Sequence, residues 1–226
     1  MANSKGKSGK LFYLLIAAVV VVGGYLLLAA RGSEEAPALA PMPLGVAIDA
    51  DASAGTPYGD DAAAVTIMDF SDYLCPHCRT FNAMSAKLLR QNHAGSGGSL
   101  RWVSYDFPLW PESWAPAIAA QCAKLQGSYW EMHDMLFARV DSWSTERNPN
   151  GKFVDYAKDL GLDSGAFKQC VDGQETLSSV QALRAYGESL GISGTPAVFF
   201  DGEPVTNGLD YGSLEQRIQA ATNAGE

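Results

Sequence analysis

The spacing of hydrophobic and polar positions divides the chain into three parts. Between Leu11 and Ala30 the residues carry no charge and are mostly apolar. As a helix this run would extend roughly 30 Å, the thickness of the hydrocarbon core of a bilayer. Residues 31–56 are rich in alanine, proline and glycine and keep neither a helical nor a strand period for long. We therefore predict one transmembrane helix at 11–30, followed by a flexible linker at 31–56.

Residues 57–226 have the pattern of an α/β domain. The runs 65–70 (VTIMDF) and 100–105 (LRWVSY) are typical of strands, and the segment between them has helical spacing that ends near His93. A strand, a helix and a strand in this order require a parallel pair with a right-handed crossover. From about 110 to 190 helical patterns dominate. We interpret this stretch as a helical insertion that precedes a C-terminal hairpin and helix.

The distribution of charge predicts how the transmembrane helix is oriented. Three lysines lie within residues 1–10, whereas a single arginine follows the apolar run before the first acidic residues. Positive charge is retained on the cytoplasmic side, so we expect a cytoplasmic N-terminus at 1–10 and a periplasmic or otherwise extracytoplasmic domain. A cleavable signal peptide is the alternative, but its apolar region is normally shorter. Moreover, Pro41 follows the best small-residue cleavage site, Ala38-Leu39-Ala40.

The remainder of the chain is acidic. All 25 acidic residues lie after Arg31, and the net charge of the whole chain is −9. Affinity for nucleic acid depends mainly on clustered lysine and arginine, and the sequence shows no such stripe after Arg31. We therefore exclude nucleic acid as a partner.

The sequence Cys75-Pro76-His77-Cys78 is the clearest candidate for chemistry. Two cysteines separated by two residues can form a small disulfide ring across the first turn of a helix, where Pro76 leaves no N–H unpaired. The helix start would stabilise a Cys75 thiolate, which makes Cys75 the nucleophile and Cys78 the resolving cysteine. We expect His77 to lower the pKa of Cys75 further by charge or hydrogen bonding. The alternative is an exposed helix residue without an electronic role.

Asp69 lies in the strand that leads into this motif, on the same side as Val65 and Ile67. Burial among such apolar neighbours would raise the pKa of the Asp69 carboxyl, and carboxyls perturbed in this way often have functional roles. An aspartate at a hydrated strand end is the alternative.

Cys122 and Cys170 lie in the helical insertion, and neither belongs to a second CxxC sequence. An even number of cysteines in an oxidising compartment suggests two pairs. A bridge between these two would stabilise the fold by roughly 4 kcal/mol in the chain-entropy model. We interpret them as a structural disulfide, with a second redox pair as the alternative.

The cysteines do not have the spacing of a structural zinc site. Such a site normally needs a second pair of ligands at short spacing, and neither Cys122 nor Cys170 has a neighbouring cysteine or histidine that would supply it. We predict no metal and no organic cofactor. A metallochaperone that binds copper or zinc through Cys75 and Cys78 remains an alternative.

Several segments resemble the DsbA family of bacterial disulfide oxidoreductases. They are 65–81 (VTIMDFSDYLCPHCRTF), 106–109 (DFPL), 122–137 (CAKLQGSYWEMHDMLF) and 191–202 (GISGTPAVFFDG). The resemblance covers about residues 57–221. It implies a thioredoxin-like fold with a helical insertion, here preceded by the single predicted transmembrane helix.

The resemblance also implies roles for single residues. Thr195-Pro196 matches the cis-proline position, which offers backbone hydrogen bonds to an extended substrate. Asp69 matches a buried acid that moves protons for the inner cysteine, Cys78. Thr195 stands where DsbA itself has valine, at a position that helps to set redox properties in the family. This difference leaves the strength of oxidation open.

We therefore expect an oxidase that introduces disulfides into exported proteins. The resemblance implies that a membrane partner similar to DsbB or VKOR reoxidises it. A disulfide reductase or isomerase with the same dithiol is the alternative, because the sequence identifies the two cysteines but not their reduction potential.

Overall fold

The structure is a computed structural model that describes residues 55–224. The predicted cytoplasmic N-terminus (1–10), the predicted transmembrane helix (11–30) and nearly all of the predicted linker (31–56) lie outside these residues. Within 55–224, the helices lack the combination of length and apolarity that crossing a membrane requires.

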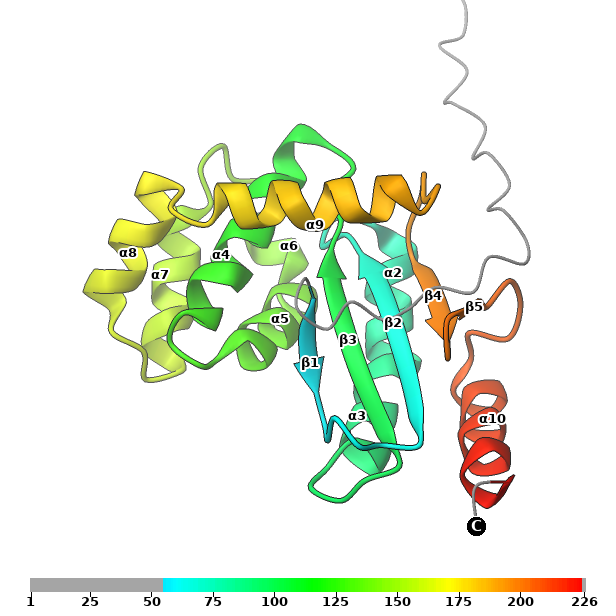
Figure 1. Ribbon diagram of the computed structural model, residues 1–226. Helices are drawn as coiled ribbons and strands as arrows, with labels where there is room; N and C mark the ends of the chain where they lie inside the picture. The colour runs from blue at the N-terminus through cyan, green and yellow to red at the C-terminus, as the bar shows by residue number, and fades with distance from the viewer. Residues whose placement is uncertain (1–54, 225–226) are drawn as a thin grey trace, which may run out of the picture. The chain divides into compact units, whose positions relative to one another are not determined.

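The described residues contain a five-stranded mixed sheet in the order β1-β3-β2-β4-β5 (Figure 1). The central strands β2 and β3 are parallel, as the strand, helix and strand pattern predicts, and the other pairs are antiparallel. The first strand begins at Thr56, which the sequence pattern placed in the linker. A three-residue strand is too short to show an alternating pattern. The strands are β1 (Thr56–Tyr58), β2 (Val65–Ser71), β3 (Leu100–Asp106), β4 (Ala197–Phe200) and β5 (Glu203–Pro204).

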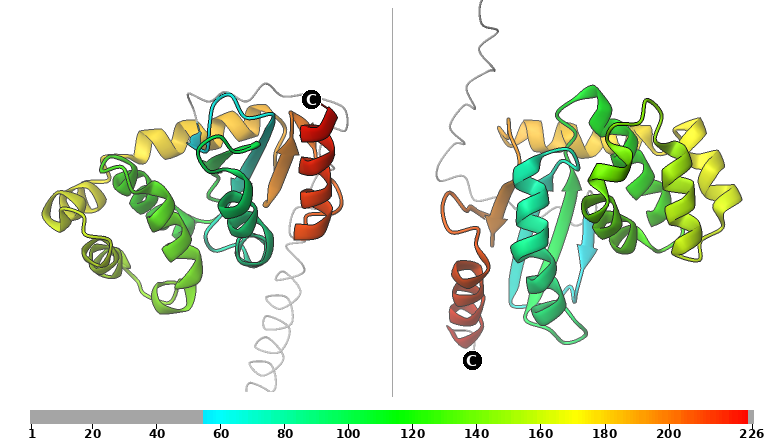
Figure 2. Two further views of the ribbon diagram at one scale, coloured as in Figure 1. Left: turned by 90° about the horizontal axis from the view of Figure 1, so that it is seen from below. Right: turned by 180° about the vertical axis from the view of Figure 1, so that it is seen from behind.

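A continuous helical stretch follows β2 and carries the two cysteines of the motif at its start. It consists of α2 (Pro76–Phe81), the π-helical segment η1 (Asn82–Ala86) and α3 (Lys87–His93). Residues Val65 and Ile67 of β2 pack with Leu89 of α3 and with Leu214 and Ile218 of α10 (Tyr211–Ala224). These helices therefore cover one face of the sheet, as the rear view in Figure 2 shows for α2 and α3.

The opposite face of the sheet is covered by α9 (Leu177–Ser189), which runs across it in Figure 1. Met68 and Phe70 of β2 pack there with Leu183 of α9. Gly187 allows this close approach, because a Cβ atom at that position would lie 2.7 Å from the Phe107 ring. Because helices cover both faces, β2 is buried along nearly its whole length.

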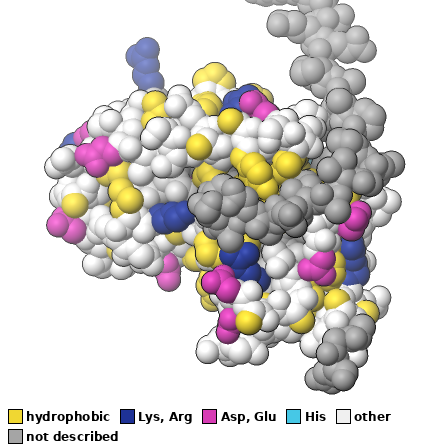
Figure 3. Space-filling model, viewed as in Figure 1, with side chains coloured by type: hydrophobic (Ala, Val, Ile, Leu, Met, Phe, Trp, Pro, Cys, Tyr) yellow, Lys and Arg dark blue, Asp and Glu magenta, His cyan; other side chains and the backbone are white. Residues whose placement is uncertain are grey.

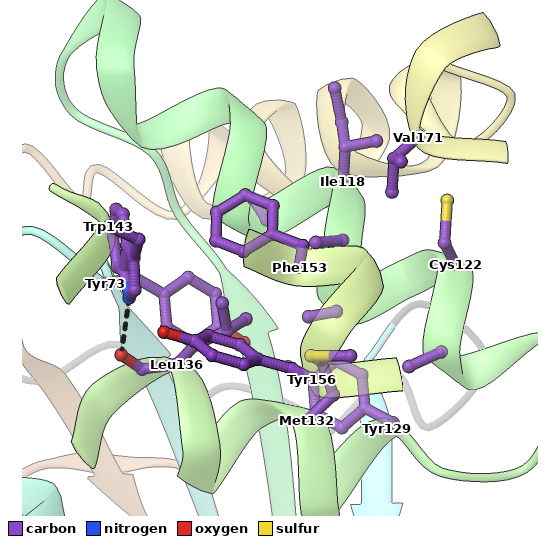
Figure 4. Packing of buried hydrophobic residues seen from close by; sticks show 14 of the residues in the cluster. Tyr73, Ile118, Cys122, Tyr129, Met132, Leu136, Trp143, Phe153, Tyr156 and Val171 are labelled. Carbon is purple, nitrogen blue, oxygen red and sulfur yellow. Dashed lines mark hydrogen bonds between the residues drawn. The ribbon is translucent and has the colours of Figure 1, made fainter. Parts of the chain in front are cut away.

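The predicted helical insertion is present between β3 and β4. After the short 3₁₀ turn η2 (Pro111–Ser113) it contains α4 (Trp114–Lys124), α5 (Tyr129–Ala138), α6 (Val140–Trp143), α7 (Asn150–Asp159), α8 (Ser164–Gly173) and α9. Figure 4 shows its core, in which aromatic and aliphatic side chains of successive helices face one another. The buried Trp143 indole donates a hydrogen bond of 3.0 Å to the Leu136 carbonyl, which satisfies its only polar atom.

The Cys122–Cys170 disulfide ties the insertion together. It joins α4 to α8, and both half-cystines are buried. At the start of α8, Asp163 accepts hydrogen bonds from the backbone N–H groups of Gly165 and Ala166, the usual arrangement of a capping aspartate. On the face seen in Figure 3, acidic and basic side chains are interspersed, which favours solubility.

Candidate active site

The site forms where β2 ends and α2 begins. Cys75 is the residue immediately before α2, and Pro76 occupies the first position of that helix. The backbone turn before it is fixed by a hydrogen bond of 3.1 Å from the Cys75 N–H to the Asp72 carbonyl. The Asp72 carboxylate also accepts hydrogen bonds from the backbone N–H groups of Leu74 and Leu109. The loop that presents Cys75 is therefore held from both of its sides.

The two cysteines of the motif have opposite electrostatic environments. In the structure both are thiols rather than a disulfide. A hydrogen bond from Cys78 is the main cause that lowers the pKa of Cys75 to about 5, and Thr195 and the backbone N–H groups of His77 and Cys78 act in the same direction. Burial is the main cause that raises the pKa of Cys78 well above its ordinary value. Cys75 is therefore the thiolate and Cys78 the proton-bearing partner.

Thr195 and Pro196 lie directly against this pair. The Thr195–Pro196 peptide bond is cis, and the Cys75 Sγ lies 3.3 Å from the Thr195 carbonyl oxygen, to which it donates a hydrogen bond when it is protonated. The sequence places these residues 120 positions after Cys75, so only the fold brings them together.

His77 is exposed, and its backbone N–H rather than its ring accounts for its contribution to Cys75. The ring lines a groove of about 730 Å³ together with Pro196, Leu209 and Tyr211. We call this the Pro196 groove. The expected effect of the His77 ring on the pKa of Cys75 stays a prediction.

A second groove, of about 510 Å³, lies along α2 and is lined by Cys75 itself with Tyr73, Arg79, Met84 and Val140. We call this the Cys75 groove. Met84 lines both grooves and is one of the exposed large hydrophobic side chains of the described residues. Leu74, Pro76, Met84 and Val140 give the Cys75 groove apolar surroundings.

Asp69 is buried in β2, as its apolar neighbours predicted. Its carboxylate accepts a hydrogen bond of 2.6 Å from the Ser71 hydroxyl. Burial raises its pKa to about 6, and the Ser71 hydrogen bond and the charge of Arg90 oppose that rise. Among the described contacts none joins Asp69 directly to Cys78. Its role as a proton carrier therefore stays a proposal.

Sequence reasoning missed a buried carboxylate that supports the site. Asp106 at the end of β3 accepts hydrogen bonds from the hydroxyls of Tyr73 (3.0 Å) and Tyr129 (2.9 Å) and from the Gln121 amide (2.6 Å). Tyr73 belongs to the loop before Cys75, whereas Tyr129 and Gln121 belong to the insertion. Asp106 therefore links the insertion to the loop that presents Cys75. The signals in the sequence are that a charged residue ends a strand and that Asp106 begins the segment 106–109, which resembles the DsbA family.

The Cys122–Cys170 disulfide lies within the insertion core and is enclosed. Its half-cystines are 1% and 4% exposed. Attack on a disulfide requires access to a sulfur atom, and neither sulfur offers it in the folded domain.

Comparison with known proteins gives a consistent family assignment. The model of a family described as "Thioredoxin" matches residues 52–220. The disulfide bond formation protein D of Bacillus subtilis is 24% identical over 164 residues, which are 71% of this chain and 74% of that protein. A Na⁺/H⁺ antiporter NhaA 3 of Salinispora tropica is 30% identical over 166 residues, 72% of this chain. The chain spans only 24% of that antiporter's length.

Solved structures agree in fold. BdbD from Bacillus subtilis, in its oxidised form, superposes with a TM-score of 0.70 at 21% identity and covers 79% of this chain and 98% of its own. The α-DsbA1 of Wolbachia pipientis superposes with a TM-score of 0.64 at 19% identity, covering 76% and 94%. The chain therefore belongs to the thioredoxin family and is similar to DsbA-like thiol-disulfide oxidoreductases.

Proposed function

We propose that the Cys75–Cys78 couple introduces disulfides into exported proteins. The observation that carries this proposal is the opposite perturbation of the two thiols: the pKa of Cys75 is lowered to about 5 and that of Cys78 is raised. A stabilised Cys75 thiolate makes the reduced form favourable, so the disulfide form accepts electrons readily. This stabilisation supports electron flow from client thiols to the protein.

The chemistry needs two successive exchanges. A client thiolate attacks Sγ of Cys75 in the Cys75–Cys78 disulfide, which forms a mixed disulfide and releases Cys78 as a thiolate that takes up a proton. A second client thiolate then attacks the client sulfur of the mixed disulfide, forms the client disulfide and releases the Cys75 thiolate. Because the pKa of Cys75 is low, it is a good leaving group. The client loses two electrons and the protein gains them.

The other site residues support these exchanges. Thr195 and Pro196 lie beside Cys75, where their backbone is placed to bind an extended client segment. Asp69, with a pKa of about 6, exchanges protons with the Cys78 side of the couple. The enclosed Cys122–Cys170 disulfide has a structural role.

The cellular setting belongs to the same proposal. The domain acts on the extracytoplasmic or periplasmic side, held to the membrane by the predicted helix at 11–30 with residues 1–10 in the cytoplasm. Reduced exported proteins are its clients, and a membrane reoxidase resembling DsbB or VKOR restores the disulfide. The likeness to the Bacillus disulfide bond formation protein supports this setting.

Two alternative functions use the same cysteines. A disulfide reductase or isomerase would use the couple in the opposite direction. The Thr195 side chain lowers the pKa of both Cys75 and Cys78, so it affects the reduction potential that decides between an oxidase and a reductase. A metallochaperone would bind copper or zinc through Cys75 and Cys78. Among residues 55–224, no group of three or more Cys, His, Asp or Glu side chains is placed to hold a metal ion.

The proposal is tested by oxidation of a reduced dithiol peptide with the purified, oxidised protein. We expect Cys75→Ser to abolish formation of the peptide disulfide, because Cys78 alone cannot form the disulfide that a client thiolate attacks. A Cys122→Ser, Cys170→Ser double variant should retain the activity. Activity that survives in Cys75→Ser would refute the assignment of Cys75 and point to the second pair.

A further inference from the structure

A bidentate ion pair joins the helix of the active site to the helical insertion. The Arg79 Nη1 and Nη2 atoms each lie 2.8 Å from one carboxylate oxygen of Asp141. Arg79 follows Cys78 directly in α2, and Asp141 belongs to α6. The Arg79 guanidinium therefore binds a carboxylate through two parallel hydrogen bonds, the arrangement that its planar shape favours.

This pair lies beside the reactive sulfur. Arg79 and Cys75 line the same groove, the Cys75 groove, and Val140 next to Asp141 lines it as well. Among the residues that line this groove, Arg79 is the only basic one, and none is an aspartate or glutamate. A client segment whose cysteine reaches Cys75 through this groove passes the Arg79 side chain.

The carboxylate of Asp141 is exchangeable. Its side chain is 81% exposed, and that of Arg79 is 38% exposed. An ion pair this exposed contributes little to stability, because water competes for both partners. Replacing Asp141 by the carboxylate of a client restores the same two hydrogen bonds to Arg79, so the exchange costs little.

The Pro196 groove, which shares Thr80 and Met84 with the Cys75 groove, has the opposite charge. Asp210 lines it, and hydrogen bonds from Ser213 lower the pKa of Asp210, which keeps it ionised. The Asp210 carboxylate caps α10 through the Ser213 N–H and hydroxyl. The two grooves therefore differ in charge, with a cation lining one and an anion lining the other.

We propose that Arg79 is a specificity residue that selects client segments carrying an aspartate or glutamate close to the reacting cysteine. The client carboxylate displaces Asp141 and binds Arg79 in the Cys75 groove. This selection rests on the proposed oxidase function. The chain has a net charge of −9, which repels acidic client segments. The positive charge of Arg79 would offset this repulsion close to Cys75.

The test uses single-cysteine peptides that differ only near the cysteine, carrying glutamate, glutamine or lysine two positions before or after it. Rates of mixed-disulfide formation with the oxidised protein are measured at low salt. We expect the ratio of glutamate to glutamine rates to lie only modestly above one in the unchanged protein, where Asp141 competes for Arg79, and to reach about two- to fivefold in Asp141→Asn, the size expected of an exposed ion pair. High salt should reduce this ratio.

Three variants and one control separate selection from structure. Arg79→Gln should bring the ratio to about one, Arg79→Glu should favour the lysine peptide, and Asp141→Asn should raise the ratio because Arg79 is then free. Arg139→Gln is the matched control, since Arg139 forms a comparable exposed pair with Asp159 at 2.9 Å. This control should leave the ratio unchanged.

Failure of the selection by Arg79 and failure of the proposed oxidase function give different results. Equal ratios in the unchanged protein and in Arg79→Gln, or an equal change in Arg139→Gln, would overturn the selection by Arg79. If the oxidised protein forms mixed disulfides with none of the peptides, the proposed oxidase function itself fails and the inference fails with it.

Discussion

Ionisation of Cys75 should make the reduced form gain stability over the oxidised form as the pH rises. The pKa of Cys75 is lowered from 9.0 to about 5, chiefly by the hydrogen bond from Cys78. In the unfolded reduced chain this thiol regains its ordinary pKa, whereas in the oxidised protein it does not titrate. The difference in the free energy of unfolding between the reduced and oxidised forms should therefore depend on pH through the ionisation of Cys75.

The magnitude follows from linkage. A depressed pKa stabilises the folded reduced form fully above the unfolded value of 9.0, and this contribution is lost as the pH falls through about 5. At pH 7, two pKa units above the folded value, it amounts to about 2.7 kcal/mol. Because Cys75 lines a groove at the surface, where solvent screens a thiolate, we expect a smaller value of about 1–2 kcal/mol.

The assay is denaturant unfolding of the reduced and oxidised forms across this pH range. The Cys122–Cys170 disulfide must stay intact in both forms, which mass spectrometry after thiol labelling verifies. Cys78→Ala is the matched variant, because it removes the main hydrogen-bond donor to Cys75. We expect its Cys75 pKa, followed by thiolate absorbance, to rise markedly. A free-energy difference that does not change between pH 5 and pH 8, or an unchanged Cys75 pKa in Cys78→Ala, would refute the reasoning.

Three further predictions concern other parts of the structure. Because burial raises the pKa of Asp69 to about 6 from 3.8, Asp69→Asn should increase the free energy of unfolding at pH 8 by up to about 3 kcal/mol, and this gain should vanish below about pH 4. Replacing Cys122 and Cys170 by serine should lower the free energy of unfolding by about 4 kcal/mol in denaturant titrations. Gly187→Ala should lower the melting temperature, because its Cβ would lie 2.7 Å from an aromatic ring, whereas Gly151→Ala, with nothing within 4 Å, should not.

Each of these has a distinct contradicting result. A pH-independent effect of Asp69→Asn would mean that the carboxyl is not perturbed by burial. A double serine variant as stable as the unchanged protein would show that the second disulfide does not brace the insertion. Equal melting temperatures for the two alanine variants would remove the argument for close packing of α9 on the sheet.

The larger elements could be predicted from the sequence because several local signals agree. The apolar runs of β2 and β3, with a helical pattern between them, specify a parallel pair, and the structure contains it. The predicted C-terminal hairpin is present as well, with β4 paired to β5. The strand β1 has only three residues, too few for an alternating pattern to be recognised, and tertiary pairing alone defines it.

Some residues of the candidate site could be predicted from the sequence and others could not. Cys75 and Cys78 could be predicted because both lie in one short motif. Asp106 could not, since its partners Tyr73 and Tyr129 lie 33 and 23 positions away along the chain. Contacts over such separations depend on how the insertion folds back on the sheet, and no local pattern contains that information.

The reduction potential of the Cys75–Cys78 couple, measured by equilibration with glutathione, tests the central claim most directly. Stabilisation of the Cys75 thiolate predicts a potential of about −180 mV or higher, in the range of protein disulfide isomerase and stronger oxidants. A potential near about −270 mV, the value of thioredoxin, would contradict the oxidase assignment and favour a reductase.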